Sequence, residues 1–291
     1  MKSKTVIAHA MVGAIALSIA VTGCTRPGGA SAAAPAAPAA ADGAVGAFVE
    51  NGPAPTQSSV RSARGSYTYT TRTVRGTGFA SGVLYTPTAG GTYGAILLLP
   101  PFLVNATALA PFAQRYASNG FVVLAMNART TGDFPSARAS QGRAALTFLK
   151  TQAKVDSSRV GVGGYSMGGG ATLEVVASDP SIKAGVPMVP WDLGRTFGNN
   201  RVPTMILAAG ADTVAAPSSH AIPFYNSIPA STPKGLAIFS GQSHFSPSTP
   251  PAGMTQLGVA WMKYYVDGDA RYKQFIVNPG GTQRFSVSGV N

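Results

Sequence analysis

The sequence predicts an α/β domain with a mostly parallel central sheet that is flanked by helices on both faces. Several short apolar runs are continuous rather than alternating, which is typical of strands buried on both faces. Stretches with helical spacing lie between these runs, as they do in strand–helix–strand units. The chain has 291 residues, of which 45% are apolar and 11% charged, so it can bury a substantial core and is not wholly disordered.

The first residues predict export. Lys2 and Lys4 precede an apolar run over residues 6–21, which is the arrangement of a secretory signal peptide. Residues 21–24, Val-Thr-Gly-Cys, resemble the bacterial lipobox, in which the cysteine becomes the lipidated first residue of the mature protein. The alternative is cleavage near residues 30–34, with Cys24 discarded. We expect residues 1–24 to be a signal peptide with a lipobox, and the protein to be secreted or anchored to the cell envelope through lipidated Cys24.

Residues 25–60 are rich in Ala, Pro, Gly and Ser and carry few large apolar side chains to offset the entropy cost of ordering. They predict a disordered tether that spans some ~30 Å. The composition changes after this segment, so we place the catalytic domain at residues 61–291. No internal apolar segment is long enough to predict a membrane span.

Charge and metal-binding residue types exclude several functions. The net charge is +12, but the basic residues form no dense run and no aromatic-basic motif, which argues against nucleic-acid binding. One cysteine allows no intrachain disulfide and no Cys-based zinc site, and three histidines are too few for a His-rich metal site. We therefore expect no metal and no cofactor. We also expect the protein to be a monomer.

The elements of the domain follow in order. Alternating stretches at residues 67–74 and 79–85 predict two strands that add an antiparallel edge to the sheet. Continuous apolar runs predict buried strands at residues 95–99, 121–125, 160–163, 184–189, 204–208 and 236–239. Helical stretches are predicted at residues 109–118, 140–152, 167–177, 222–226 and 253–266. We find no internal repeat and no second domain boundary.

The turn after the strand at residues 160–163 carries the chemistry. Gly164, Ser166 and Gly168 form a Gly-x-Ser-x-Gly motif between a strand and a helix, where the strained turn exposes the serine hydroxyl. A dinucleotide-binding Gly-x-Gly-x-x-Gly pattern fails, because the sixth position counted from Gly161 is Ser166, and no Gly-Lys-Ser/Thr of a P-loop follows. We predict that Ser166 is a nucleophile.

A serine nucleophile needs a base that is oriented by an acid. His9 belongs to the signal peptide, and His220 lies at a predicted helix start, where packing near the cleft is the simpler role. His244 follows the last core strand, which is where an α/β-hydrolase delivers its base. We therefore predict His244 as the base.

The acid is expected between Ser166 and His244 in the chain. Glu174 lies inside the helix after Ser166, and Asp179 precedes Pro180 in a helix-ending turn. Asp192 follows a strand end and is a real competitor. We favour Asp212, because it follows the strand next to the one that delivers His244.

Two backbone donors are needed for an oxyanion hole. The N–H of Met167 follows the nucleophile, and Phe102 supplies the first N–H after Pro100 and Pro101, since proline has none. Aromatic residues adjoin these positions at Phe102, Tyr165, Trp191 and Phe245, which favours a groove for an apolar or aromatic acyl group.

Six motifs occur in a fixed order: Gly-Tyr-Ser-Met-Gly-Gly-Gly at 164–170, Val-Pro-Trp-Asp at 189–192, Asp-Thr-Val-Ala at 212–215, Gly-Gln-Ser-His-Phe at 241–245, Gly-Val-Ala-Trp-Met-Lys at 258–263 and Asp-Ala-Arg-Tyr at 269–272. In order and spacing, the chain from about Gly65 onward resembles the bacterial cutinase and polyester-hydrolase family, which includes the poly(ethylene terephthalate) hydrolases. The resemblance implies one α/β-hydrolase domain without a large lid, and an open groove that accepts polymer chains.

The resemblance also implies roles for single residues. It implies Phe102 and Met167 as oxyanion donors, and an acyl site lined by Trp191, Tyr165 and Val214, to which the adjacent Phe102 and Phe245 are added as substrate-binding residues. His220 and Phe224 match the common cutinase form of the pocket, not the form in which smaller residues free the tryptophan.

Three departures from the family pattern stand out. Pro101 replaces the glycine that usually precedes the oxyanion aromatic residue. Val277 stands where the family has one cysteine of its C-terminal disulfide, a loss of about 2–4 kcal/mol relative to bridged relatives if it is uncompensated. Members are usually freely secreted, so a lipid anchor is unusual.

The resulting hypothesis is a serine hydrolase that cleaves carboxylic esters through an acyl-enzyme, acting on cutin-like and synthetic polyesters and on short to medium acyl esters. One alternative keeps the triad but acts on envelope lipids as a lipase or acyltransferase. Another is a surface binding protein on an inactive scaffold, against which the complete triad argues. The natural ester is left open by the sequence.

Overall fold

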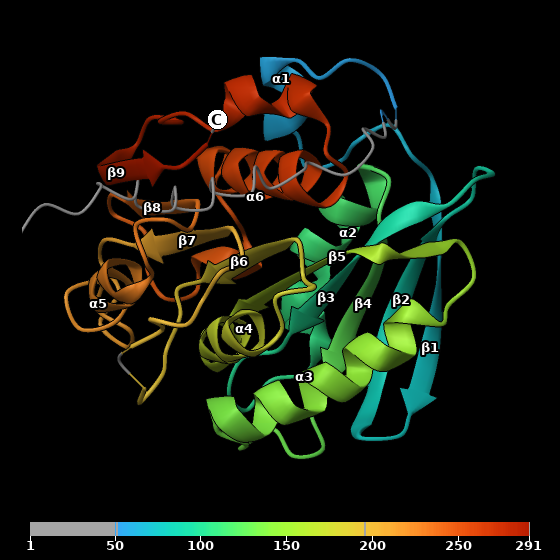
Figure 1. Cartoon of the computed structure of the whole chain (residues 1–291), viewed down its shortest axis with the longest axis horizontal. Coiled ribbons are helices and arrows are strands. Elements are labelled where there is room, and N and C mark those ends of the chain that lie inside the picture. Colours follow the sequence, from blue (N-terminus) through green and yellow to red (C-terminus); the bar gives the residue numbers. More distant parts are fainter. Residues whose placement is uncertain (1–49, 51, 195, 291) are drawn as a thin grey trace, which may run out of the picture. The chain divides into compact units, whose positions relative to one another are not determined.

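The described part of the chain is built around one nine-stranded sheet (Figure 1). The computed structural model describes residues 50, 52–194 and 196–290. The strands, in chain order, are β1 (Tyr69–Gly76), β2 (Phe79–Pro87), β3 (Tyr93–Leu99), β4 (Val122–Asn127), β5 (Val155–Tyr165), β6 (Ala184–Met188), β7 (Thr204–Ala209), β8 (Lys234–Phe239) and β9 (Thr282–Ser288). Across the sheet they run β1-β2-β4-β3-β5-β6-β7-β8-β9.

The sheet is mostly parallel, as the continuous apolar runs predicted. Every neighbouring pair from β4 to β8 is parallel, while β1–β2, β2–β4 and β8–β9 are antiparallel. The predicted antiparallel edge made by the first two strands is therefore confirmed, as is the α/β-hydrolase class.

Helices connect the strands. They are α1 (Gln57–Arg61), α2 (Ala110–Ser118), α3 (Pro135–Lys150), α4 (Met167–Ser178), α5 (Ala221–Ser227) and α6 (Ala252–Val266), with short 3₁₀ turns η1 (Ala106–Leu109), η2 (Ser246–Ser248) and η3 (Ala270–Phe275). Within the part of the chain that the structure describes, no helix is both long and apolar enough to cross a bilayer.

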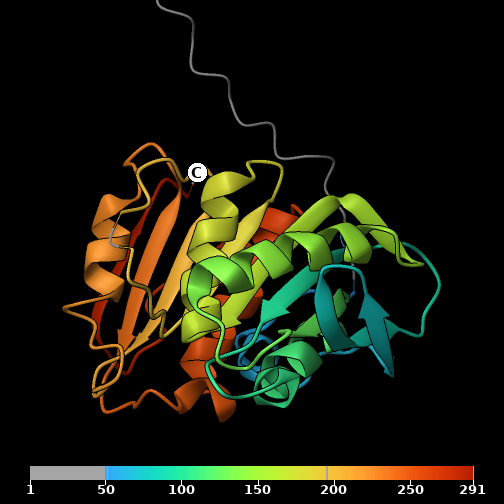
Figure 2. The same ribbon diagram turned by 90° about the horizontal axis from the view of Figure 1, so that it is seen from below.

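The helices cover both faces of the sheet (Figures 1 and 2). Side chains of β3 show this, because successive residues of a strand point to opposite faces. Ile96 and Leu98 pack in one cluster with α2 and α6. Leu97 and Leu99 pack in a second cluster with α3 and α4. All four side chains are fully buried, so this strand lies inside the molecule on both faces and is apolar without interruption.

One predicted helix begins several residues early, and the predicted tether overlaps a helix that the sequence analysis did not predict. The helix predicted at residues 140–152 is α3, which starts at Pro135. Proline suits the first turn of a helix, but residues 135–139 have weak apolar spacing. The predicted tether of residues 25–60 also ends too late, because α1 begins at Gln57 and buries Val60 at 1% exposure. The predicted signal peptide, Cys24 and most of the predicted tether lie outside the described residues.

The strand β9 was missed by the sequence analysis. It pairs with β8 in antiparallel fashion at the far edge of the sheet. Its half-buried Phe285 and Val287 face the core and alternate with polar residues. This alternation is typical of a strand with one solvated face, a weaker pattern than the continuous runs of the central strands.

The parallel strands deliver six loops to one edge of the sheet. These loops follow the carboxyl ends of β3, β4, β5, β6, β7 and β8, which are neighbours in the sheet. In open α/β sheets this edge is the usual place for a binding site. The predicted nucleophile, base, acid and oxyanion donors all lie on these loops or at the start of the helix that follows.

Candidate active site

Ser166 lies on the sharp turn between β5 and α4. Its backbone has φ of 58° and ψ of −120°, a conformation that costs a non-glycine residue strain energy. Three backbone hydrogen bonds hold the turn: Ser166 N–H donates to the Met188 carbonyl (3.0 Å), and the Ser166 carbonyl accepts from Trp191 (2.9 Å) and Gly170 (3.0 Å). The strained turn is thus anchored to the loop after β6.

Two glycines make this turn possible. A Cβ atom on Gly164 would collide with the carbonyl of Gly168, and a Cβ atom on Gly168 would collide with the carbonyls of Leu99 and Pro100. The start of α4 therefore packs directly on the backbone at the end of β3. Side chains at these two positions would separate Ser166 from the loop that carries Phe102.

A hydrogen-bonded chain links Ser166 to two residues from other loops. The Nε2 atom of His244 lies 2.8 Å from Ser166 Oγ, and its Nδ1 atom lies 2.7 Å from Asp212 Oδ2. The three residues are 5%, 7% and 4% exposed, in the order Ser166, His244 and Asp212. The structure thus brings together the predicted nucleophile, base and favoured acid. Asp212, and not its competitor Asp192, bonds the imidazole.

The carboxylate of Asp212 is held in its charged form. Burial alone raises its pKa, but hydrogen bonds from His244 and from the backbone N–H groups of Ala215 and Val214 outweigh burial. The pKa of Asp212 consequently lies below its usual value. With a charged acceptor facing Nδ1–H, the Nε2 atom of His244 is left to accept the proton of Ser166.

Two backbone N–H groups on segments next to the nucleophile turn have no hydrogen-bond acceptor among the described residues. Met167 is the first residue of α4, so its N–H has no intrahelical acceptor. Among the described residues, the N–H of Phe102 donates to no acceptor. Both predicted oxyanion donors therefore have a free N–H next to elements that contact each other through Gly168.

Trp191 is half-buried and packs between two aromatic rings. The His220 ring stacks on it at a centroid distance of 6.0 Å and an angle of 28°. The Phe134 ring lies 6.3 Å away on a different loop. Phe224 meets His220 edge-on at 5.8 Å. His220 and Phe224 therefore support the indole, in agreement with the predicted form of the pocket.

Other predicted substrate-binding residues differ in exposure. Val214 and Phe245 are 53% and 68% exposed, and Phe102 is 40% exposed. Tyr165 differs from the expectation, because it is only 4% exposed and its ring packs 5.6 Å from the His244 ring. It supports the imidazole from the inside more than it offers surface to a substrate.

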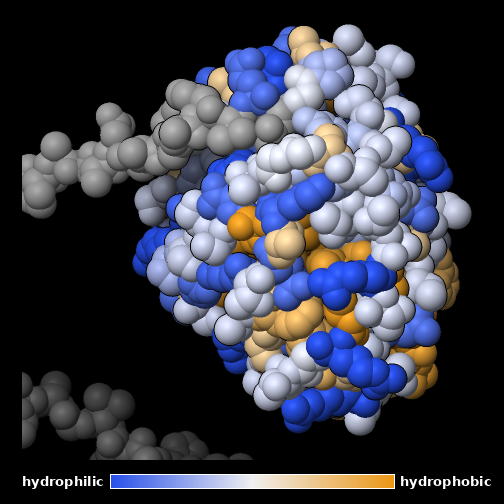
Figure 3. Space-filling view, turned by 90° about the vertical axis from the view of Figure 1, so that its right-hand side faces the viewer, coloured by the Kyte–Doolittle hydropathy of each residue, from blue (hydrophilic) through white to orange (hydrophobic). Residues whose placement is uncertain are grey.

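Large exposed apolar side chains gather on the loops of the site. We define the apolar rim as Phe102, Leu103, Val104, Phe134, Leu193, Val214 and Phe245, each at least 40% exposed. Among the described residues, Val277 is the one large apolar side chain of this exposure outside the rim. The face on the β1 side mixes hydrophilic and neutral residues with apolar areas near its middle (Figure 3). The rim makes the surroundings of Ser166 unusually apolar.

The remaining acidic candidates have other roles. Asp179 ends α4 and accepts hydrogen bonds from Ser181, as its predicted turn requires. Glu174 packs beside Asp192. Burial, and then the charge of Asp192, raises the pKa of Glu174 to about 7, against the opposing charge of Arg143. These two carboxyl groups form a pair beneath the Trp191 loop.

Two residues of the site region were missed by the sequence analysis. Phe134 extends the aromatic group around Trp191. Arg138 is fully buried and donates to carbonyls beside Phe102. Arg138 lies on the buried stripe of α3, with Pro135, Gly142 and Ala145 at helical spacing. A charge on that stripe was the available signal, but the predicted helix began only at residue 140.

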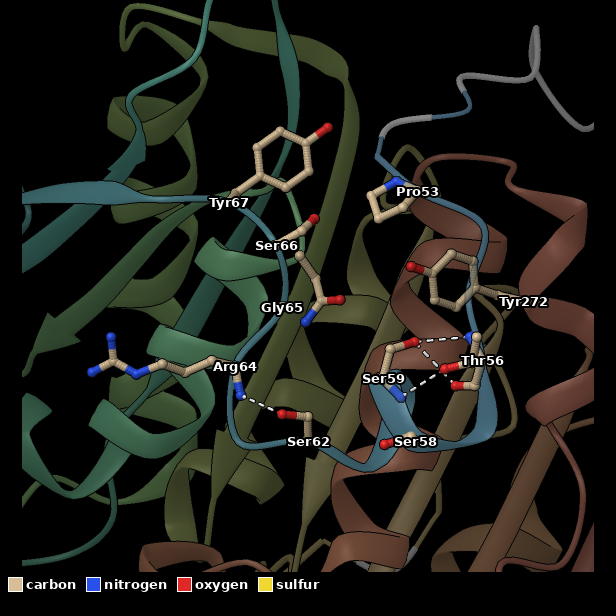
Figure 4. Close-up of a pocket in the computed structure, with 11 residues that line it drawn as sticks. Pro53, Thr56, Ser58, Ser59, Ser62, Arg64, Gly65, Ser66, Tyr67 and Tyr272 are labelled. Atoms are coloured by element: carbon tan, nitrogen blue, oxygen red, sulfur yellow. Dashed lines mark hydrogen bonds between the residues drawn. The ribbon is translucent and has the colours of Figure 1, made fainter.

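A pocket of about 380 Å³ lies among residues outside the site (Figure 4). Its walls are rich in hydroxyl groups and comprise Pro53, Thr56, Ser58, Ser59, Ser62, Arg64, Gly65, Ser66, Tyr67, Asn119 and Tyr272. Thr56 and Ser59 bond each other in the capping box of α1, and Ser62 accepts from the Arg64 N–H. These hydroxyls therefore stabilise the N-terminal turn.

Within the described ranges, no cluster of three or more metal-binding side chains occurs.

Comparisons with known proteins show which family this chain resembles. A family model described as PET hydrolase-like matches residues 43–290. Bis(hydroxyethyl) terephthalate hydrolase of Streptomyces coelicolor is 39% identical over 236 residues, which cover 78% of this chain and 76% of that protein. Cutinase est1 of Thermobifida alba is 40% identical over 78% of this chain and 80% of its own length. A cutinase of Thermobifida fusca is 38% identical, with 78% of each chain covered.

Proposed function

Because this chain belongs to the PET hydrolase-like family of cutinases and polyester hydrolases, it is a carboxylic ester hydrolase, and we propose that it acts through Ser166, His244 and Asp212. The observation that carries the proposal is the hydrogen-bonded chain from Asp212 through His244 to Ser166. Ester and polyester chains are its substrates.

The reaction proceeds through an acyl-enzyme. Ser166 Oγ attacks the ester carbonyl while His244 Nε2 takes its proton, and the imidazolium is stabilised by Asp212. The tetrahedral intermediate collapses, and His244 returns the proton to the leaving alcohol. Water, deprotonated by His244, then attacks the acyl-enzyme and releases the carboxylic acid and free Ser166.

The N–H groups of Phe102 and Met167 stabilise the oxyanion of both tetrahedral intermediates. The two N–H groups stabilise the transition state most when they are in place before the charge forms, because a preorganised donor needs no reorganisation during the reaction. Loss of one donor costs on the order of 10²–10³ in rate. Backbone donors cannot be removed by side-chain exchange, so their positions depend on what holds the two loops.

The acyl site suits apolar and aromatic groups. The half-buried Trp191 and the exposed Val214 and Phe245 offer apolar surface beside Ser166. An open, apolar site of this kind accepts a segment of a long polymer chain. Rates on short-chain and long-chain nitrophenyl esters, compared with the rate on a polyester film, test which substrates the site accepts. A strong preference for long chains would favour the lipase alternative instead.

The decisive test is labelling and turnover with Ser166→Ala. We expect a fluorophosphonate probe to modify the wild-type protein at Ser166, and the variant to lose both labelling and hydrolysis of nitrophenyl esters and film. Ser158→Ala serves as the control, because Ser158 is an exposed serine on β5. Equal rates in wild type and Ser166→Ala would remove Ser166 from the mechanism.

We also propose that the protein is exported and that Cys24 carries a lipid. The signal-like start and the Val-Thr-Gly-Cys sequence support this. A relative is a cutinase, and an enzyme that acts on an extracellular polymer such as cutin has to leave the cell. Incorporation of labelled palmitate into wild type but not into Cys24→Ala tests the anchor.

We further propose that the protein is a monomer. Light scattering measures its mass in solution and checks this proposal.

A further inference from the structure

Arg138 is a buried arginine without an ion pair. Its side chain lies on α3 and has 0% exposure. Among the described residues, no carboxylate oxygen lies within ion-pair distance of its guanidinium, and the charge of Asp133 acts on it from further away. Burying a charge is costly unless its donors are satisfied. The structure therefore has to offer this side chain other acceptors.

Backbone carbonyls of two loops supply those acceptors. Nη1 donates to the carbonyls of Pro100 and Pro101, both at 3.1 Å. Nη2 donates to the carbonyls of Thr131 (3.0 Å) and Asp133 (2.8 Å), and Nε donates to Asp133 at 3.3 Å. The planar fork of one guanidinium thus ties the segment after β3 to the segment before α3.

The segment after β3, which we call the oxyanion loop (residues 100–104), has few other ways to be held. Pro100 and Pro101 have no N–H, so the backbone of this part of the loop can form hydrogen bonds only through its carbonyls. The first anchoring N–H of the loop belongs to Leu103, which donates to the Thr131 carbonyl at 2.8 Å. Leu103 has a φ of 59°, which is unfavourable for leucine and requires such support.

The oxyanion loop also contacts the nucleophile turn. Gly168 packs against the carbonyls of Leu99 and Pro100 so closely that a Cβ atom would not fit. The N–H of Phe102 is therefore placed relative to Ser166 by the start of α4, by Arg138 and by the hydrogen bond of the Leu103 N–H. The second loop held by Arg138 leads to Phe134, whose ring contacts Trp191.

We propose that Arg138 is a positioning residue for the reaction: by holding the carbonyls of Pro100 and Pro101, it fixes the Phe102 N–H where the oxyanion forms. The inference rests on the proposed function, because it presupposes attack by Ser166. Small displacements matter here, since misplacement by about 1 Å can cost on the order of 10² in rate.

The test compares Arg138→Lys and Arg138→Gln with wild type and Arg159→Lys. Lysine keeps the charge but cannot bond four carbonyls, so we expect kcat on a soluble nitrophenyl ester to fall about 10- to 100-fold, with KM changed by less than about threefold. Binding of a boronic acid, which forms a tetrahedral adduct with Ser166, should weaken by a similar factor.

Arg159 is the matched control. It is an arginine with 9% exposure that bonds Asp156, Asp267 and the Thr92 carbonyl. It precedes Ser166 by seven residues on β5, or about 20 Å along a strand. We expect Arg159→Lys to lower the melting temperature while kcat stays within about twofold of wild type. Equal kcat losses in folded Arg138→Lys and Arg159→Lys, or unchanged kcat and boronate binding in Arg138→Lys, would overturn the proposal.

A third variant tests the proposal if the Arg138 variants do not fold. In Pro101→Gly the loop loses proline rigidity but retains both carbonyls that Arg138 binds. If Arg138 places the Phe102 N–H, kcat falls less than tenfold; a larger fall would show that proline rigidity, and not Arg138, places it. Failure of the proposed function itself is distinguishable, because wild type would then neither hydrolyse esters nor react with a fluorophosphonate.

Discussion

Asp212 shows how the surroundings of a single side chain decide its role. Asp192 and Asp212 both follow strand ends on the same edge of the sheet, and both are 4% exposed. Only Asp212 receives the His244 Nδ1 hydrogen bond together with two backbone N–H donors. Asp192 instead accepts from the Gly194 N–H and lies beside Glu174. Identical side chains thus have different electrostatic partners.

Exchange of Asp212 for asparagine tests whether Asp212, and not Asp192, is the acid that orients His244. An amide at this position no longer stabilises the imidazolium and favours the wrong tautomer of His244, so we expect kcat to fall by about 10³–10⁴. Steady-state hydrolysis of a nitrophenyl ester measures the loss. Asp192→Asn is the comparison, and it should lose far less. A larger loss in Asp192→Asn than in Asp212→Asn would contradict the assignment of the acid.

At the scale of an element, α4 combines the strained nucleophile turn with a carboxyl group, Glu174, about two helical turns further on. Glu174 of α4 faces Asp192 in the loop after β6, with Arg143 of α3 as the opposing charge. A carboxyl group whose pKa is raised in the folded state stays protonated while the same group in the unfolded chain ionises. Rising pH therefore disfavours folding between the usual pKa of glutamate and about 7.

The raised pKa of Glu174 predicts that Glu174→Gln stabilises the folded protein, and that this stabilisation increases with pH. Below about pH 4 the group is protonated in both states, so the exchange should change the melting temperature little. Above pH 7 it removes the cost of ionising Glu174 beside Asp192. Because the group is partly exposed, we expect only about 1 kcal/mol, or about 2–4 °C. Calorimetric melting at pH 4 and pH 8 measures the difference, and an equal shift at both values would contradict it.

At the scale of the whole molecule, the apolar rim sets Ser166 inside a surface suited to contact with a solid polymer. Its members come from five loops that are separated in sequence and meet at one sheet edge. Burial of apolar surface yields about 25 cal/mol per Å² on contact with an apolar phase. Adsorption to a polyester film should therefore depend on the rim, while turnover of a small soluble ester should not require all of it.

Rim residues away from the acyl site test this dependence. We expect the double variant Val104→Ser and Leu193→Ser to adsorb to a polyester film several-fold less than wild type, and to retain its rate on a soluble nitrophenyl ester. Protein depletion from solution over the film measures adsorption. Val277→Ser is the matched control, because Val277 is 49% exposed and lies outside the rim. Equal adsorption of all three proteins would show that the rim does not bind the film.

Local patterns in the sequence were sufficient for the central strands, the nucleophile turn and the base. Continuous apolar runs report burial on both faces, a Gly-x-Ser-x-Gly turn is specified by adjacent residues, and only His220 and His244 competed as base. These features depend on neighbours in the chain or on a count of residue types. The helix boundary at Pro135 and the edge strand β9 were weaker patterns and were missed.

Only the tertiary structure decided how the loops meet. It gave the imidazole to Asp212 over Asp192, stacked His220 on Trp191, and turned Tyr165 inward against His244. It also joined Arg138 to carbonyls 37 and 38 residues earlier in the chain. Such contacts depend on which strands become neighbours in the sheet, and a backbone carbonyl offers the same acceptor at every position. The amino-acid sequence therefore does not fix which partner each of these side chains meets.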